Sequence, residues 1–475
     1  MAANGTASIA YNAEFKLAQR RGLFILYCTY AGFYLSRKAD SVVKAKLHEE
    51  EGFSMEDLAF LDTVYLAVYT VALAGSGVFG GYFSSNKLLS GALVLLALTS
   101  FLKARSTSVY MFACCQIIHA MCQSVGWPTC IKLIGTWVTE NRGFVMGLWT
   151  TCQSMGGILG AVLGTFFLTH HTWQWAYLYH IPILLFLSLV VFNFIEEAPT
   201  QSRGHAYSNV DEEDDLESPN SALMASGKAS SSSPRKQPSD QKISLANVLM
   251  IPGVVNIGVA YFFLKFMRYA LLMWLPYYYE EGLLFDQSSA GYMSTSFEMG
   301  GLVGTPFIGW FSDKILTGRR DLTSACFLAV AGAMLSGCIL VSGMGTFLNA
   351  AFMFFVGITV IGPDSILSGT IAQDLGSASK MGPNVIGTLA GLINSVGSCG
   401  SIFQSYSTAY ISKVYGWSTL FGVFVAFACI SSGILFRVAL FLNSQSTDDR
   451  RSLQKAILVL TCVFCSGMFV VHIHK

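Results

Sequence analysis

Two segments far apart in the chain repeat one arrangement of aromatic and cationic residues. The first has Tyr30, Tyr34 and Arg37, and the second has Tyr261, Lys265 and Arg268 at the same intervals. On an α-helix of 3.6 residues per turn, positions separated by four and by seven residues share one face. Each segment therefore predicts a helix that presents a stripe of side chains ending in an arginine.

The two arginines indicate a binding site for an anion. A guanidinium group in the middle of a bilayer costs roughly 2.5–3.5 kcal/mol on insertion scales, and two such groups that face each other also repel. An anion between them offsets both costs. Guanidinium groups match phosphate oxygens in pairs, and a phosphate ester carries a charge of about −1.5 to −2 near pH 7. We therefore expect Arg37, Arg268 and Lys265 to bind phosphate.

Other polar side chains in apolar segments are candidates for contacts with the rest of a ligand. The hydroxyls of Tyr30, Tyr34 and Tyr69 could donate to phosphate or sugar oxygens, with packing or an interfacial aromatic belt as the alternative. Gln153 and Asn394 lie in glycine-rich segments and could bind sugar hydroxyls. The alternative for these two amides is hydrogen bonding between helices.

Acidic residues in the same segments are candidates for charge partners. Asp364 directly follows Gly362-Pro363 and is expected to act either as a counter-charge or as an acceptor for a sugar hydroxyl. Glu298 is expected to pair with or gate a cation of the site rather than to contact the ligand. The alternative to anion binding is that the two arginines reach the membrane interface or pair with Asp40, Glu298 or Asp364.

Composition places these residues in a membrane. Of the 475 residues, 53% are hydrophobic and 12% are charged, against about 25% charged in ordinary soluble domains. Four long runs have no Asp, Glu, Lys or Arg: 143–195, 322–363, 381–412 and 414–436. A helix that crosses a bilayer needs about 20 apolar residues, and helices satisfy their own backbone there. We therefore expect an all-α polytopic membrane protein. A soluble enzyme, a disordered chain and, at a net charge of +1, a nucleic-acid binder driven by bulk charge are excluded.

Twelve spans can be assigned along the chain. They are expected at 22–45, 56–84, 87–105, 107–138, 142–169, 173–195, 252–280, 287–316, 322–342, 346–373, 381–412 and 416–443. Between the sixth and seventh, residues 196–242 carry an acidic cluster at 211–215 and cannot bury a core, so a disordered linker is expected. The linker separates a six-helix half at 1–195 from a second at 243–443, which is followed by a tail at 444–475.

The tail contains one further apolar stretch. Residues 456–471 follow Arg450-Arg451 and are short for a span. An interfacial helix is the alternative, but we favour an extra membrane helix.

The distribution of charge predicts the orientation. Basic residues near the span ends gather on one face, which includes the N-terminus and the linker, whereas acidic residues at 49–57 and 280–286 fall on the other. Lys103, Arg105 and Lys413 are exceptions. Because cytosolic loops are enriched in lysine and arginine, we expect the N-terminus and the linker to be cytosolic.

The repeated stripes predict how the halves meet. Equivalent helices of two six-helix halves lie around a pseudo-two-fold axis, with the substrate between them. Gly126-Trp127-Pro128 in the fourth span corresponds to Gly362-Pro363 in the tenth, the equivalent span of the second half. Spans one, four, seven and ten are therefore expected to line the path. Glycine repeats at 156, 160 and 164, at 300 and 304, and at 387 and 391 predict close helix packing.

Several short motifs resemble one known family. They are YLSRK at 34–38, SVVK at 41–44, QSVGWP at 123–128, RGFVMGLW at 142–149, IPGVV at 251–255 and WLP at 274–276. On these, the chain resembles the organophosphate:phosphate antiporter family of the major facilitator superfamily, and within it the eukaryotic glucose-6-phosphate (sugar-phosphate) exchangers. The resemblance covers residues 20–440 and implies the major facilitator fold, with two six-helix halves in pseudo-two-fold symmetry.

The resemblance also implies roles for individual residues. Arg37 and Arg268 match phosphate-clamping arginines, and Lys38 matches the lysine beside the first of them. Tyr30, Tyr34 and Tyr69 match tyrosines lining the site, and Glu298 matches an acidic residue on the eighth helix. Where bacterial relatives carry a histidine on the fifth helix and a lysine on the second, this chain has Gln153 and Leu73.

The expected function is exchange of a sugar phosphate such as glucose-6-phosphate for inorganic phosphate by alternating access. A three-carbon organophosphate such as glycerol-3-phosphate or phosphoenolpyruvate is one alternative, and a non-transporting membrane sensor or scaffold is another. No nucleophile–base arrangement or metal-binding pattern stands out, so no enzyme activity, cofactor or metal is expected. The expected partners are the two phosphorylated ligands and the lipid bilayer, in a monomer or homodimer. The resemblance implies the endoplasmic reticulum or another internal membrane, with the plasma membrane as the alternative.

Overall fold

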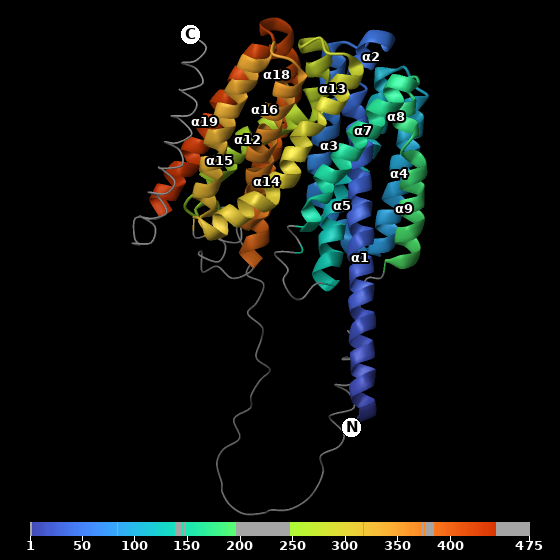
Figure 1. Ribbon diagram of the computed structural model, residues 1–475. Helices are drawn as coiled ribbons and strands as arrows, with labels where there is room; N and C mark the ends of the chain where they lie inside the picture. The colour runs from blue at the N-terminus through green and yellow to red at the C-terminus, as the bar shows by residue number, and fades with distance from the viewer. Residues whose placement is uncertain are drawn as a thin grey trace, which may run out of the picture.

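The computed structural model describes residues 2–82, 84–137, 145, 148–195, 248–316, 318–371, 375 and 384–442. Within these ranges the regular elements are helices, and no strand occurs. The predicted linker at 196–242, most of the RGFVMGLW motif and the apolar stretch at 456–471 lie outside the described residues. The all-α architecture predicted from the apolar runs is confirmed (Figure 1).

Six long helices and two short ones form the first half of the chain. Their bounds are α1 Ala2–Val42, α2 Lys44–Glu51, α3 Met55–Tyr82, α4 Ser85–Ala104, α5 Val109–Trp137, α7 Cys152–His170, α8 Trp175–Leu178 and α9 Ile181–Phe194. Most predicted spans agree within a few residues. The first does not, because α1 begins well before residue 22. The intervening residues, among them Lys16, Leu17, Ala18 and Gln19, are good helix formers and give no stop signal.

The second half repeats this order. Its elements are α12 Val254–Tyr277, the π-helical turn η1 Tyr278–Gly282, α13 Gln287–Met293, α14 Thr295–Lys314, α15 Arg320–Val341, α16 Thr346–Ser365, the π-helical turn η2 Ile366–Thr370, α18 Asn384–Tyr415 and α19 Trp417–Leu442. Pro363 lies inside α16. It cannot donate to the carbonyl one turn earlier, and the α-helix gives way to η2 directly after Ser365.

Helix contacts in the two halves match one another. In the first half α1 packs on α7, α3 on α5, and α4 on both α5 and α9. In the second half α12 packs on α18, α14 on α16, and α15 on both α16 and α19. These are the same contacts between helices of equivalent order, as expected for a pseudo-two-fold arrangement. Between the halves, α1 meets α12, α3 meets α18, and α7 meets α14.

Length and composition single out eight helical segments of the described residues as able to cross a membrane. They comprise α4, α5, α7, α8 with α9, α12 with η1, α15, α16 and α19. The other long helices, α1, α3, α14 and α18, are the ones that, with α7 and α12, form the contact between the halves. The polar side chains of these four helices lower their mean hydropathy. For these four, the prediction of a membrane span is therefore supported by their position in the bundle rather than by hydropathy.

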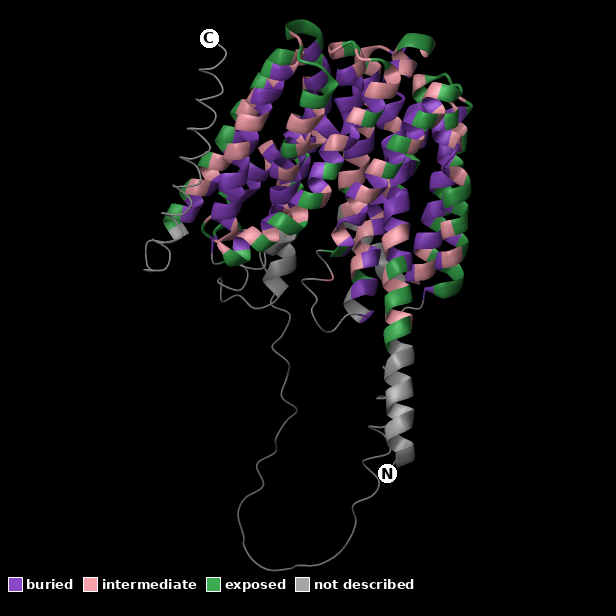
Figure 2. Cartoon of the chain, viewed as in Figure 1, coloured by how far each residue is buried: buried purple, intermediate pink, exposed green. Residues whose placement is uncertain are grey.

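Buried residues run through the full height of both halves, and exposed residues gather at the ends and on the outer faces (Figure 2). The short helices α2 and α13 lie at the end of the bundle opposite the N-terminal part of α1 (Figure 1). The acidic residues at 49–57 and 280–286 therefore share that end, as the charge pattern predicts.

Candidate functional site

Arg37 lies buried inside the bundle, among four tyrosine rings. Its side chain projects from α1, and the residue is only 7% exposed. Its guanidinium carbon lies 5.1–5.7 Å from the ring centroids of Tyr34, Tyr65, Tyr69 and Tyr269. Rings attract cations through their faces. However, Nε and Nη2 are buried without a hydrogen-bond partner. A buried cation with unused donors is costly unless a ligand supplies acceptors.

The helix that carries Arg37 is held by close glycine contacts with α7. A Cβ at Gly156 would fall 2.8 Å from Cβ of Tyr34, and a Cβ at Gly160 would fall 2.7 Å from Cβ of Lys38. Only glycine allows backbones to approach so closely. The predicted close packing is confirmed at Gly156, Gly160, Gly300 and Gly304. At Gly164 a Cβ would make only an ordinary contact, 3.7 Å from Val42, and Gly391 has nothing within 4 Å of its Cβ position.

Arg268 differs from Arg37 in having a carboxylate partner. Its Nη1 forms an ion pair with Oδ2 of Asp364, which follows Gly362-Pro363 on α16. This is the pairing that the sequence offered as an alternative to anion binding, and it is present in this conformation. The second carboxylate oxygen, Oδ1, is buried without a hydrogen-bond donor, and Asp364 is 6% exposed.

Equivalent positions of the two stripes make equivalent hydrogen bonds. The hydroxyl of Tyr34 donates to Oε1 of Gln153 on α7 at 2.9 Å. In the second half, Nζ of Lys265 donates to Oδ1 of Asn394 on α18 at 2.6 Å and to Oγ of Ser398 at 3.1 Å. Both amides therefore form bonds between helices, which is the alternative to direct ligand contact. These bonds fix Tyr34 and Lys265 beside the two arginines.

The two remaining predicted tyrosines have different surroundings. Tyr30 is 4% exposed and packs against Phe33, Trp127 and Trp149, so its ring belongs to the apolar core. Tyr69 stacks on Tyr65, with ring centroids 6.1 Å apart, and also faces Arg37. The packing alternative fits Tyr30, whereas Tyr69 lies at the predicted site.

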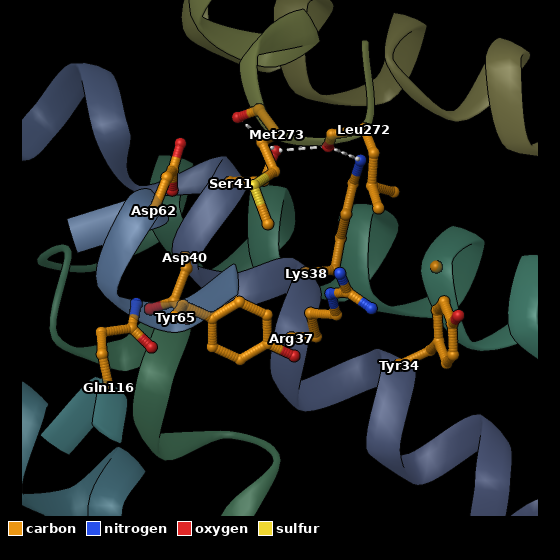
Figure 3. A pocket seen from close by; sticks show the side chains of 11 residues that line it. Tyr34, Arg37, Lys38, Asp40, Ser41, Asp62, Tyr65, Gln116, Leu272 and Met273 are labelled. Atoms are coloured by element: carbon orange, nitrogen blue, oxygen red, sulfur yellow. Dashed lines mark hydrogen bonds between the residues drawn. The ribbon is translucent and has the colours of Figure 1, made fainter. Parts of the chain in front are cut away.

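A cavity adjoins Arg37 (Figure 3). Its lining residues are Tyr34, Arg37, Lys38, Asp40, Ser41, Asp62, Tyr65, Gln116, Gly157, Leu272 and Met273. Arg37 and Lys38 contribute the cationic wall, and Asp40 and Asp62 contribute the acidic wall. Tyr65 lies at the boundary, and its hydroxyl is buried without a hydrogen-bond partner.

The carboxylates of the acidic wall are paired with buried lysines. Asp62 of α3 forms an ion pair with Lys44 of α2. Asp40 accepts from Lys103 of α4 at 2.8 Å and from the hydroxyl of Tyr177 at 2.9 Å. Lys103, an exception to the charge pattern in the sequence, is 1% exposed and therefore an internal charge partner.

Polar contacts join the two halves beside the cavity, toward the end that carries α2 and α13. Lys38 donates to the carbonyl of Leu272 on α12 at 3.3 Å, and Oγ of Ser41 donates to the carbonyls of Leu272 and Met273 at 3.0 and 3.1 Å. At the surface of the same end, Lys413 and Glu56 pair at 2.6 Å across the halves. Another exception to the charge pattern thus joins the two halves.

Glu298 lies at the contact between α14 and α7. A Cβ on Gly157 would lie 3.1 Å from its Cδ, and the carboxylate interacts electrostatically with Lys38. Among the described residues no ion pair within 4.0 Å joins the two side chains. Glu298 therefore lies near Lys38 but forms no ion pair with it in this conformation.

Comparison with known proteins agrees with this geometry. The sequence profile of the Major Facilitator Superfamily matches residues 26–405, which include both stripes. The chain belongs to the major facilitator superfamily.

Curated relatives within the superfamily match over nearly their whole length. Putative glycerol-3-phosphate transporter 5 of Arabidopsis thaliana is 29% identical over 458 residues, covering 88% of this chain and 90% of the relative. The glucose-6-phosphate exchanger SLC37A2 of Homo sapiens is 27% identical over 467 residues, covering 88% and 92%. Its counterpart in Mus musculus is 27% identical, covering 88% and 91%. The resemblance stated from the motifs is confirmed.

Sequence reasoning missed two rings around the arginine of this major facilitator protein. Tyr65 precedes Tyr69 by four residues, and that helical spacing places both on one face of α3, so Tyr65 could have been predicted together with Tyr69. Tyr269 could not have been found in this way. It follows Arg268 directly, and neighbouring residues point in different directions on a helix, so only the crossing of α12 over α1 brings it to Arg37.

Proposed function

We propose that this protein is an alternating-access antiporter that exchanges a phosphorylated sugar, such as glucose-6-phosphate, for inorganic phosphate. The observation that carries the proposal is the state of Arg37, a buried guanidinium with two nitrogens that lack acceptors. The names of the relatives, glucose-6-phosphate exchangers and glycerol-3-phosphate transporters, support a phosphorylated ligand.

Phosphate would bind mainly to Arg37, with Tyr34, Tyr65 and Tyr69 around it. Guanidinium N–H groups and a phenolic hydroxyl are donors, and hydrogen bonds from a cation to an oxyanion are the strong ones. Arg268 and Lys265 would complete the cationic surroundings from the second half. Lys38 and Glu298 would act as two opposite charges whose separation changes when the halves move.

Antiport follows from electrostatics in this proposal. An empty site leaves the charge of Arg37 uncompensated in a low-dielectric surrounding. Movement of the halves past each other without a bound anion is therefore costly, and a bound phosphate or organophosphate removes that cost. Exchange would be driven by the gradients of the two ligands.

The described conformation corresponds to one end state of the cycle. The hydrogen bonds from Lys38 and Ser41 to α12, and the pair between Lys413 and Glu56, would close the end carrying α2 and α13. With the N-terminus and the linker in the cytosol, this would be the state that opens to the cytosol. The two moving bodies would be residues 1–195 and 243–443, in an internal membrane such as the endoplasmic reticulum.

A three-carbon organophosphate is the second candidate ligand, since several relatives are named as glycerol-3-phosphate transporters. The test is uptake of radiolabelled phosphate into proteoliposomes loaded with phosphate, with glucose-6-phosphate, glycerol-3-phosphate and phosphoenolpyruvate as competitors. The ranking of competitors identifies the ligand. Absence of phosphate uptake by well-inserted protein would contradict exchange and favour a sensor or scaffold.

A further inference from the structure

Asp364 has an acceptor that nothing in the described protein uses. Its Oδ2 pairs with Arg268, but Oδ1 is buried and receives no hydrogen bond. A carboxylate can only accept, and leaving such an atom unpaired away from water is unfavourable. The unused oxygen is therefore free to accept a hydrogen bond from a ligand that carries a donor. A simple oxyanion such as sulfate carries no donor.

This acceptor and the unused donors of Arg37 are linked through α12. Arg268, the partner of Asp364, directly precedes Tyr269 on that helix. The ring of Tyr269 lies 5.2 Å from the guanidinium carbon of Arg37, which the rings of Tyr34 and Tyr69 also face. Unused N–H groups of Arg37 and an unused carboxylate oxygen of Asp364 therefore flank consecutive residues of one helix.

We propose that Asp364 determines specificity by accepting a hydrogen bond from a hydroxyl carried by the bound oxyanion. The hydroxyl is either the P–OH of inorganic phosphate or a C–OH of the organic part, and both supply the same donor. An oxyanion without a hydroxyl leaves Oδ1 unpaired and brings its own charge against the carboxylate. The inference rests on the proposed function, because it assumes that the oxyanion binds at Arg37.

A series of four dianions separates the sources of the hydroxyl. At about pH 8.5, above the second ionisation of a phosphate monoester near pH 6, phosphate has a P–OH and glycerol-3-phosphate has only C–OH groups. Methyl phosphate and sulfate have neither. Thermal stabilisation of the purified protein at increasing ligand concentration gives the affinity for each one without any transport.

The wild-type protein should bind phosphate and glycerol-3-phosphate about tenfold or more tightly than sulfate and methyl phosphate. In Asp364→Asn the amide oxygen turns to Arg268, which only donates, so the amide N–H₂ faces the ligand. Affinity for sulfate should then rise and the discrimination should fall below about threefold. The matched control is Asp321→Asn, which removes a carboxylate paired at 3.1 Å with Arg319 at the start of α15 and should leave the ranking unchanged.

Each outcome bears on the inference. Tight binding of phosphate alone assigns the donor to P–OH, and tight binding of glycerol-3-phosphate alone assigns it to C–OH. Equal binding of all four dianions by the wild type, or full discrimination by Asp364→Asn, overturns the proposal, and the wild-type series suffices if the variant does not fold. Equal binding combined with phosphate exchange would leave the proposed function standing, whereas binding of none of the ligands would overturn both.

Discussion

The guanidinium of Arg37 lies 5.2 Å from the centroid of the Tyr269 ring, so a cation of the first half rests against an aromatic residue of the second. The candidate site therefore exists only where α1 and α12 meet. Movement of the halves would change the surroundings of the cation itself. In the proposed mechanism, this would couple ligand binding to conformation without any separate relay.

Replacement of Tyr65 by phenylalanine should weaken phosphate binding without destabilising the empty protein. Its hydroxyl is buried and unpartnered, while its ring faces Arg37 at 5.1 Å. Phenylalanine keeps the ring and removes only the hydroxyl. Because a hydrogen bond to a charged group contributes about 1.5–3 kcal/mol, the affinity for phosphate should fall about tenfold or more, while Tm of the ligand-free protein stays the same or rises. A lower Tm with unchanged affinity would assign the hydroxyl a structural role.

Asparagine at position 40 should destabilise the fold. Asp40 is the carboxylate partner of Lys103, which is 1% exposed, and breaking a buried pair by removing one charge costs about 3–5 kcal/mol. Thermal unfolding in detergent should show a clear decrease in Tm for Asp40→Asn. The double variant Asp40→Asn with Lys103→Met, which removes both charges, should recover most of it. Equal Tm values for the wild type and the single variant would contradict a structural pair.

Reversing one charge at the end that carries α2 and α13 should loosen that end. Lys413 and Glu56 pair across the halves at 2.6 Å and are exposed, so the pair contributes less than about 1 kcal/mol. Lys413→Glu should raise amide hydrogen exchange in residues 44–51 and 287–293. The swapped double variant, Glu56→Lys with Lys413→Glu, should restore the wild-type exchange. Failure of the swap to restore it would show that the effect is not electrostatic.

Alanine at position 394 should release Lys265 from its position. Asn394 and Ser398 together accept from the ammonium group, and the shorter of the two bonds comes from Asn394. We expect an affinity for phosphate several-fold lower in Asn394→Ala, and a smaller effect in Ser398→Ala. Isothermal titration of the two variants gives the comparison. Lower affinity in neither variant would place Lys265 outside the binding site.

The sequence allowed the fold and the two arginines to be predicted because both depend on periodicity. Apolar runs and a stripe repeated at four and seven residues are local patterns, and α1 and α12 confirm that Tyr34, Arg37, Lys265 and Arg268 share such faces. Partners could not be predicted in the same way. Whether Arg268 would bind a ligand or Asp364 depends on how α12 packs on α16, which no local pattern contains.

Two of the three exceptions to the charge rule have the same origin. Lys103 and Lys413 break the expected distribution of basic residues, and the structure pairs them with Asp40 and Glu56, which are 63 and 357 positions away in the chain. Partners so far apart in the sequence can be identified only from the folded structure. A charge that departs from an otherwise regular pattern was nevertheless a usable signal that a partner exists.

The most direct test of the account is phosphate exchange by variants of Arg37. The proteoliposomes hold internal phosphate, and uptake of external radiolabelled phosphate is followed for the wild type, Arg37→Ala and Arg37→Lys. Arg105→Ala is the control, since this arginine is exposed and lies over the ring of Phe101. We predict uptake that depends on internal phosphate in the wild type and the control, at least a hundredfold loss in Arg37→Ala, and a severe loss in Arg37→Lys, because an ammonium group cannot reproduce two parallel N–H donors. Undiminished exchange by Arg37→Ala would contradict the central claim that this buried guanidinium binds the transported phosphate.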